Sequence, residues 1–151
     1  MLIAGIGNIF LSDDGFGPEV INHVPRPDND AVRVTDYGIR GMHLAYDLMD
    51  GWDGLVLVDA IPARGAPGTV HVFEADLETL SATGGLDAHS MDPGAVFASL
   101  TALGGIAPRT VVVGCEVRTV EDGIGLSDQV IAAIPEAVRA VADALAMLRE
   151  G

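Results

Sequence analysis

The sequence predicts an α/β protein, built as a three-layer αβα sandwich around a twisted, mostly parallel sheet of five strands. Its short apolar runs are continuous rather than alternating, which is typical of strands buried on both faces. Segments with helical periodicity alternate with these runs along the chain. The chain has 151 residues, of which 49% are hydrophobic. Because this length suits one ordinary core, we expect residues 1–151 to form a single domain.

Turn residues mark the boundaries of the elements in the first half of the chain. Leu2–Ile6 is an apolar run that ends in a glycine turn, so a strand is expected there. A helix is expected over Gly15–Val24, where two prolines then stop it. A strand over Val32–Thr35 and a helix over Gly41–Asp50 follow. The next run, Gly54–Val58, is the clearest buried strand of the sequence.

The second half continues the alternation of strands and helices. Thr69–Phe73 alternates as a strand, whereas residues 75–92 lack periodicity and are expected to form a loop. Pro93–Leu103 is expected to be a helix with proline in its first turn, and Thr110–Val113 to be the fifth strand. Apolar residues then recur every three or four positions to the end of the chain, which predicts a helix whose apolar stripe belongs to the core. We expect Pro135 to divide this segment into two helices.

The charge composition excludes several classes of partner. The chain carries 22 acidic and 8 basic residues, for a net charge of −14, and every basic residue is arginine. Such a surface repels phosphate backbones, so neither nucleic acid nor an anionic membrane is expected as a partner. No targeting segment or apolar stretch of about 18 residues is visible. Because Cys115 is the single cysteine and cannot form an internal disulfide, a reducing cytoplasm is expected. A monomer is expected for a domain of this small size.

Polar residues follow the predicted strands at their carboxyl ends, where open α/β sheets bind their ligands. The residues concerned are Asn8, Asp13 and Asp14 after the first strand, Asp36 and Gly38 after the second, Asp59 after the third, and Cys115 and Glu116 after the fifth. His89 lies in the long loop before a helix. Carboxylates and an imidazole together suit a hard or borderline metal ion, so a metal site at this edge is one interpretation.

Each candidate also has a structural interpretation. Asp13 or Asp14 could cap the following helix, Asp59 could be a loop carboxylate, and His89 could be a surface histidine. Within helices or strands, the histidines are interpreted as structural: His23, His43 and His71. We interpret Glu116 as a residue of the site rim or of a salt bridge. Cys115 is interpreted as a small apolar group packed at a strand end.

Several familiar sites are excluded by the residues that they need. Phe10 stands where the GxGxxG fingerprint has its third glycine, and the absence of lysine excludes a P-loop. There is no GxSxG elbow, no HExxH and no cysteine-rich zinc pattern. A phosphoacceptor receiver domain would use Asp13, Asp14 and Asp59, but it also needs a lysine to meet the phosphoryl charge. A non-catalytic metal-binding or chaperone module on the same fold is a further alternative.

The segment Gly5–Gly17, which reads GIGNIFLSDDGFG, resembles the opening signature of the hydrogenase maturation endopeptidases. The resemblance continues in the same order through Asp36–Gly41, Leu57–Ala60, the His89 segment, Val113–Glu116 and Gly125–Ser127. It implies a twisted sheet flanked by helices. It also implies a protease that removes a short C-terminal extension from the precursor of a nickel-iron hydrogenase large subunit once nickel has been inserted.

The resemblance also implies the roles of individual residues. The metal-binding residues of the family fall on Asp14, Asp59 and His89, which would be catalytic and would meet the nickel already seated in the precursor. Whether a separate metal ion is bound stays open. The residues expected to shape the site or contact the substrate are Gly7, Asn8, Asp13, Asp36, Gly38 and Glu116. Asp14 stands where some members have glutamate, and Ile39 replaces the threonine of an Asp-x-Gly-Thr motif.

Overall fold

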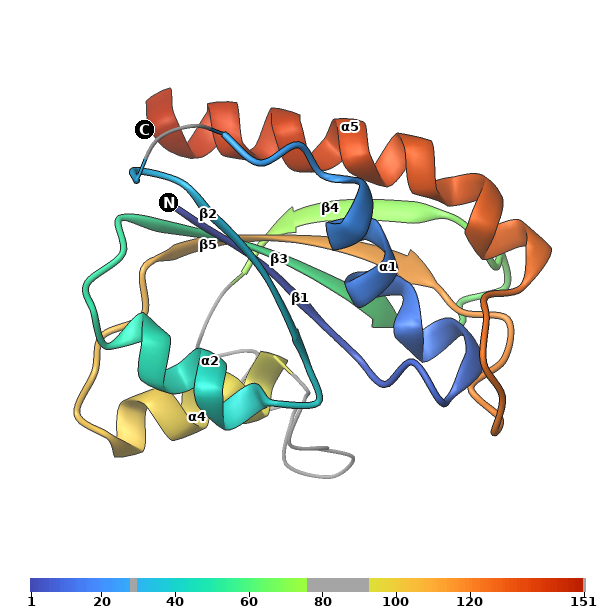
Figure 1. The fold of residues 1–151 in the computed structure, drawn as a ribbon, viewed down its shortest axis with the longest axis horizontal. Coiled ribbons are helices and arrows are strands. Elements are labelled where there is room, and N and C mark those ends of the chain that lie inside the picture. The colour runs from blue at the N-terminus through green and yellow to red at the C-terminus, as the bar shows by residue number, and fades with distance from the viewer. Residues whose placement is uncertain (28–29, 76–92, 151) are drawn as a thin grey trace.

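A computed structural model describes residues 1–27, 30–75 and 93–150, and it shows a five-stranded sheet between two layers of helices (Figure 1). The strands are β1 (Leu2–Ile6), β2 (Arg33–Gly38), β3 (Gly54–Ile61), β4 (Val70–Glu74) and β5 (Arg109–Glu116). The helices are the 3-10 turn η1 (Ser12–Gly15), α1 (Phe16–His23), α2 (Gly41–Leu48), α4 (Pro93–Ala102) and α5 (Asp128–Glu150). The predicted fold class is confirmed.

The sheet separates two hydrophobic clusters. Helices α1 and α5 cover one face of the sheet, and α2 and α4 cover the other (Figure 1). Along β3, Val56 and Val58 pack in the first cluster, whereas Leu55 and Leu57 pack in the second. Because both faces of this strand are covered, its sequence is apolar at every position instead of at every second one.

The strand order is β2-β1-β3-β5-β4, in which β4 alone runs antiparallel to its neighbour. From β1 the chain passes through α1 to β2 on one side, and from β2 through α2 to β3 on the other side of β1. The direction of winding therefore reverses between β1 and β3. Ligands of open α/β sheets bind at the carboxyl ends of the strands where this reversal occurs.

Helix α1 lies directly on the sheet because two glycines allow a close approach. A Cβ atom on Gly17 would overlap the carbonyl oxygens of Ile6 and Val58, which belong to β1 and β3. A Cβ atom on Gly5 would overlap the carbonyl of Gly17 from the opposite side. The glycines of the first motif therefore fix the start of α1 at the carboxyl edge of the sheet.

Three strands end later than predicted. The strands run further than expected: β2 includes Asp36 and Gly38, and β3 and β5 pair in parallel as far as Ile61 and Glu116. Asp59 and Glu116 therefore lie within strands and not after them, because backbone pairing continues beyond the apolar run.

The expected division of the last helix is wrong, since Pro135 lies inside a continuous α5 of 23 residues. Pro135 removes the amide that would bond the carbonyl of Ile131, and both residues are exposed, so water can satisfy this carbonyl. Although α5 is long, no helix within the described ranges is apolar enough to cross a membrane.

Candidate functional site

The loop after β1 holds one of the predicted acidic residues in place. The N–H of Gly7 donates to the carbonyl of Gly38 at 2.9 Å, and a Cβ atom on Gly7 would overlap the carbonyl oxygen of Asp14. The N–H of Asn8 donates to Oδ2 of Asp14 at 2.8 Å, while Oδ1 of Asn8 accepts from the N–H of Phe10 at 2.9 Å. The Gly-Asn sequence thus positions the partly exposed Asp14 carboxylate at the carboxyl edge of the sheet.

Asp13, the neighbour of Asp14, is fully buried. Its carboxylate accepts from the N–H groups of Arg118 (2.8 Å), Thr119 (3.1 Å) and Ser127 (2.7 Å), and from the Ser127 hydroxyl (2.8 Å). Burial by itself raises the pKa of Asp13, but these hydrogen bonds outweigh burial and hold the pKa below its usual value. Asp13 therefore ties the chain after β5 to η1.

The end of β2 forms the second wall of the site. Oδ1 of Asp36 accepts from the N–H of Gly38 at 2.8 Å, and Gly38 has a φ of +53°, which favours glycine. The guanidinium of Arg40 donates to the carbonyls of Asp36 (2.9 Å) and Tyr37 (3.2 Å). Ile39, which takes the place of the family threonine, is 59% exposed. This turn presents a carboxylate and an apolar side chain.

Two hollows meet at this edge. The smaller, of about 320 Å³, lies between the loop after β1 and the end of β2, and Gly7, Asn8 and Gly38 are among its lining residues. The larger, of about 920 Å³, extends between α1 and α5. Ile9 and Asp36 line both hollows. Neither lining includes Asp14 or Asp59, although Asn8 connects the smaller hollow to the Asp14 carboxylate.

Asp59 lies near the carboxyl end of β3 and is 9% exposed. By strand alternation it shares the face of Leu57, which α2 and α4 cover. Since η1 contacts β3, Asp14 and Asp59 come from neighbouring segments at the switch point. His89, the third predicted ligand, lies outside the described residues. Among the residues that are described, no three His, Cys, Asp or Glu side chains are placed to hold a metal ion.

Glu116 anchors a loop at the end of β5. Its buried carboxylate accepts from the N–H groups of Arg64 (2.7 Å) and Ala66 (3.2 Å), and lies 2.7 Å from Nε2 of His71. The contact with His71 is the main reason that the pKa of Glu116 is lower than usual, and the two N–H donors add to it. The interpretation of Glu116 as a salt-bridge residue agrees with this geometry.

Cys115 packs as the small apolar group that the sequence indicates, since it is 1% exposed within the cluster of α1 and α5. Burial raises the pKa of its thiol to about 12, and the nearby carboxylates of Asp13 and Glu116 act in the same direction. A thiol with this pKa is not a nucleophile at neutral pH.

Sequence reasoning missed the larger hollow, because it assigned the whole apolar stripe of the last helix to the core. Ile131 of that stripe is 51% exposed and lines the hollow, as do Ile134 and Val138. One signal was available in the sequence, because Ile124 is an apolar residue between two glycines. It lines the same hollow with 80% of its surface exposed.

Comparison with known proteins gives one consistent family. A family model described as hydrogenase maturation protease matches residues 18–144. The hydrogenase 2 maturation protease of Escherichia coli is 30% identical over 155 residues, covering 99% of this chain and 91% of the relative. The coenzyme F420 hydrogenase subunit delta of Methanothermobacter thermautotrophicus is 30% identical over 154 residues, covering 95% and 92%. The solved structure of the hydrogenase maturating endopeptidase HybD from E. coli is similar with a TM-score of 0.78 and 31% identity, covering 99% and 91%.

Proposed function

Because the chain belongs to the hydrogenase maturation protease family, we propose that it removes a short C-terminal extension from the precursor of a nickel-iron hydrogenase large subunit. The observation that carries this assignment is that Asp14 and Asp59 come from neighbouring segments at the switch point of the sheet. Asp14 is held there by the N–H of Asn8, and Asp59 projects from the adjacent β3. This edge is where the fold binds its ligands.

The chemistry of Asp14, Asp59 and His89 suits a borderline divalent ion such as nickel, because two carboxylates and one imidazole leave coordination positions open. We assign these three residues to contact with the nickel seated in the precursor, which is part of the substrate. The same contact would let the protease distinguish a loaded precursor from an empty one. No separate resident ion is needed for this recognition.

Peptide hydrolysis at this edge needs a base that activates water. A carboxylate of Asp14 or Asp59 would accept a proton from water while the oxygen of that water bonds to the scissile carbonyl carbon. The proton then passes to the amide nitrogen as the C–N bond breaks, which leaves a carboxylate on the large subunit and an amine on the released extension. Asp14 is the better placed of the two, because it is partly exposed and already oriented by Asn8.

The amino-acid composition supports a proposal for the partner and the compartment of the enzyme. A net charge of −14 favours a precursor surface with basic residues, and it disfavours nucleic acid or an anionic membrane. We place the enzyme in the cytoplasm as a monomer, where its single thiol stays reduced.

Substitution of the three residues tests their assignment. We expect each of three substitutions to reduce cleavage of a nickel-loaded precursor by at least about a thousandfold, because each removes a group that contacts the reacting centre. The substitutions are Asp14→Asn, Asp59→Asn and His89→Ala. Circular dichroism should show that the fold is retained. Asp122→Asn, in an exposed loop, is the matched control and should cleave normally. Normal processing by a variant would remove that residue from the site.

A further inference from the structure

We infer that the larger hollow is the binding groove for the C-terminal extension of the precursor, which it holds as an extended apolar segment without acidic side chains. We call it the α1–α5 groove. Its lining comes from the loop after β1, from α1, from the end of β2, from the loop before α5 and from the first half of α5. This inference rests on the proposed function, and it adds a substrate subsite to the edge that carries Asp14.

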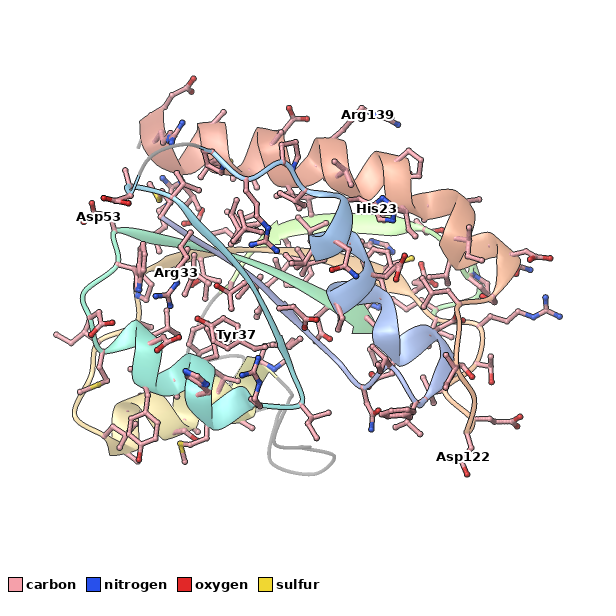
Figure 2. The ribbon with its side chains drawn as sticks, viewed as in Figure 1. His23, Arg33, Tyr37, Asp53, Asp122 and Arg139 are labelled. Atoms are coloured by element: carbon pink, nitrogen blue, oxygen red, sulfur yellow. The ribbon has the colours of Figure 1, made fainter. Side chains whose placement is uncertain are left out.

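The α1–α5 groove has the size and shape of a ligand site. Its volume of about 920 Å³ lies within the usual range for such sites. Helices α1 and α5 form its two sides, and the chain that leads into α5 lies at one end (Figure 1). His23, at the end of α1, lies on the side of that helix that faces α5 (Figure 2).

Two apolar side chains of the groove are open to water. Ile131 on α5 is 51% exposed and Ile124 in the preceding loop is 80% exposed. Both adjoin the partly buried Ile134 and Val138, which pack against the core beneath them. Apolar surface that is contiguous and open to water marks a place where another apolar group binds.

The polar residues of the groove select against acidic segments. Glu19 and Asp36 are carboxylates, and among the described residues that line the groove His23 is the one side chain that could balance their charge. Nε2 of His23 lies 3.3 Å from Oε1 of Glu19. Acidic side chains that lie beside Glu19 or Asp36 would meet like charge there, whereas neutral or basic side chains would not.

The groove is continuous with the edge where cleavage is proposed. Ile9 and Asp36 line the groove and also the smaller hollow, and that hollow includes Asn8, which orients Asp14. A chain that lies along α1 and α5 would therefore arrive beside Asp14. A terminal extension can lie along such a groove as an extended segment, because only one of its ends is joined to the folded body of the precursor.

The substitution Ile131→Asp tests the groove. Ile131 is exposed in the first turns of α5, where an acidic residue interacts favourably with the helix N-terminus, so the fold should be retained. Met147→Asp is the matched control, since Met147 is a 40% exposed apolar residue of the same helix outside the groove. Ile124→Asp is a second groove variant, located in a loop, should Ile131→Asp fail to fold.

Two measurements are made on each variant. The first gives KM and kcat for cleavage of the nickel-loaded precursor, and the second gives the Kd of a fluorescent peptide with the sequence of the extension. We expect the groove variants to raise KM and Kd by about tenfold or more, because a buried apolar contact is lost and a charge is introduced. We expect kcat to change by less than about twofold, and Met147→Asp to match the wild type.

The outcomes separate the groove from the activity. If the wild type cleaves the loaded precursor and both groove variants keep the wild-type KM, the α1–α5 groove is not the binding site of the extension. The proposed function would be unaffected by this result. A raised KM for the precursor, together with no binding of the free peptide to the wild type, would overturn the extension as the occupant. A loaded precursor left intact by the wild type would overturn the proposed function and this inference with it.

Discussion

Replacing Asp13 with alanine should destabilise the fold far more than any change at its neighbour Asp14. Asp13 is fully buried, and its carboxylate accepts three backbone N–H groups and one hydroxyl from residues 118–127. Asp13→Ala leaves these donors without their acceptor and opens the junction between η1 and the chain after β5. Asp14 accepts the N–H of Asn8 and is partly exposed, so Asp14→Asn should have a small effect.

The size of the effect follows from the hydrogen bonds. A hydrogen bond to a charged group contributes about 1.5–3 kcal/mol, but the four bonds share one carboxylate and are not additive. We expect Asp13→Ala to lower the free energy of unfolding by about 3–5 kcal/mol, which is a large part of the about 5–15 kcal/mol typical of a domain. Asp13→Asn keeps one acceptor oxygen and should cost about 2 kcal/mol.

Urea unfolding followed by circular dichroism measures these differences. Asp122→Asn is the control, because Asp122 is an exposed residue of the same loop and projects from the edge of the fold (Figure 2). It should change the free energy of unfolding by less than about 0.5 kcal/mol. A loss below about 1 kcal/mol for Asp13→Ala would refute the structural role of this carboxylate.

The pH dependence gives a second check on Asp13. Its pKa is lower in the folded chain than in the unfolded one, so its stabilisation is complete above the unfolded value of about 3.9. The stabilisation is then lost as the pH falls through the folded value. The gap in stability between the wild type and Asp13→Asn should therefore be constant from about pH 5 to 7 and shrink below about pH 4.

Two further predictions concern the end of β5. Glu116→Gln should lower stability at pH 7, because the pKa of Glu116 is lowered by His71 and by two N–H donors. In urea titrations the difference in stability from the wild type should be full above the unfolded value of about 4.3 and should narrow as the pH falls below it. A difference that does not narrow with falling pH would contradict this role. Cys115, with a thiol pKa raised to about 12, should not react with a disulfide reagent in the native protein at pH 8 but should react in urea; rapid native labelling would show that this strand end is open.

The fold could be predicted from the sequence because its signals are local. The run Gly54–Val58 is apolar at every position, which requires cover on both faces, and this is the position that β3 occupies. The prolines and glycines that end the elements act through their own backbone preferences. Pro135 shows the limit of such signals, since a proline on the exposed side of a long helix is tolerated.

The site could be predicted only in part, because its details depend on distant contacts. The sequence does not distinguish the role of Asp13 from that of its neighbour Asp14. The structure does, because the hydrogen-bond donors to Asp13 come from residues more than 100 positions away. Glu116 likewise receives its N–H donors from a loop about 50 residues earlier. Ile131 follows the apolar period of α5, yet half of its surface is left exposed by the part of the chain that the structure describes. The assignment of His89 stays a prediction.

Cleavage of a matched pair of precursors tests the proposed activity most directly. The wild-type protein would be mixed with nickel-loaded and nickel-free large-subunit precursor from the same organism, and mass spectrometry would detect loss of a C-terminal peptide. We predict that the loaded precursor is cleaved and the nickel-free one stays intact. Cleavage of both would contradict recognition of nickel by Asp14, Asp59 and His89, and an intact loaded precursor would contradict the proposed protease activity itself.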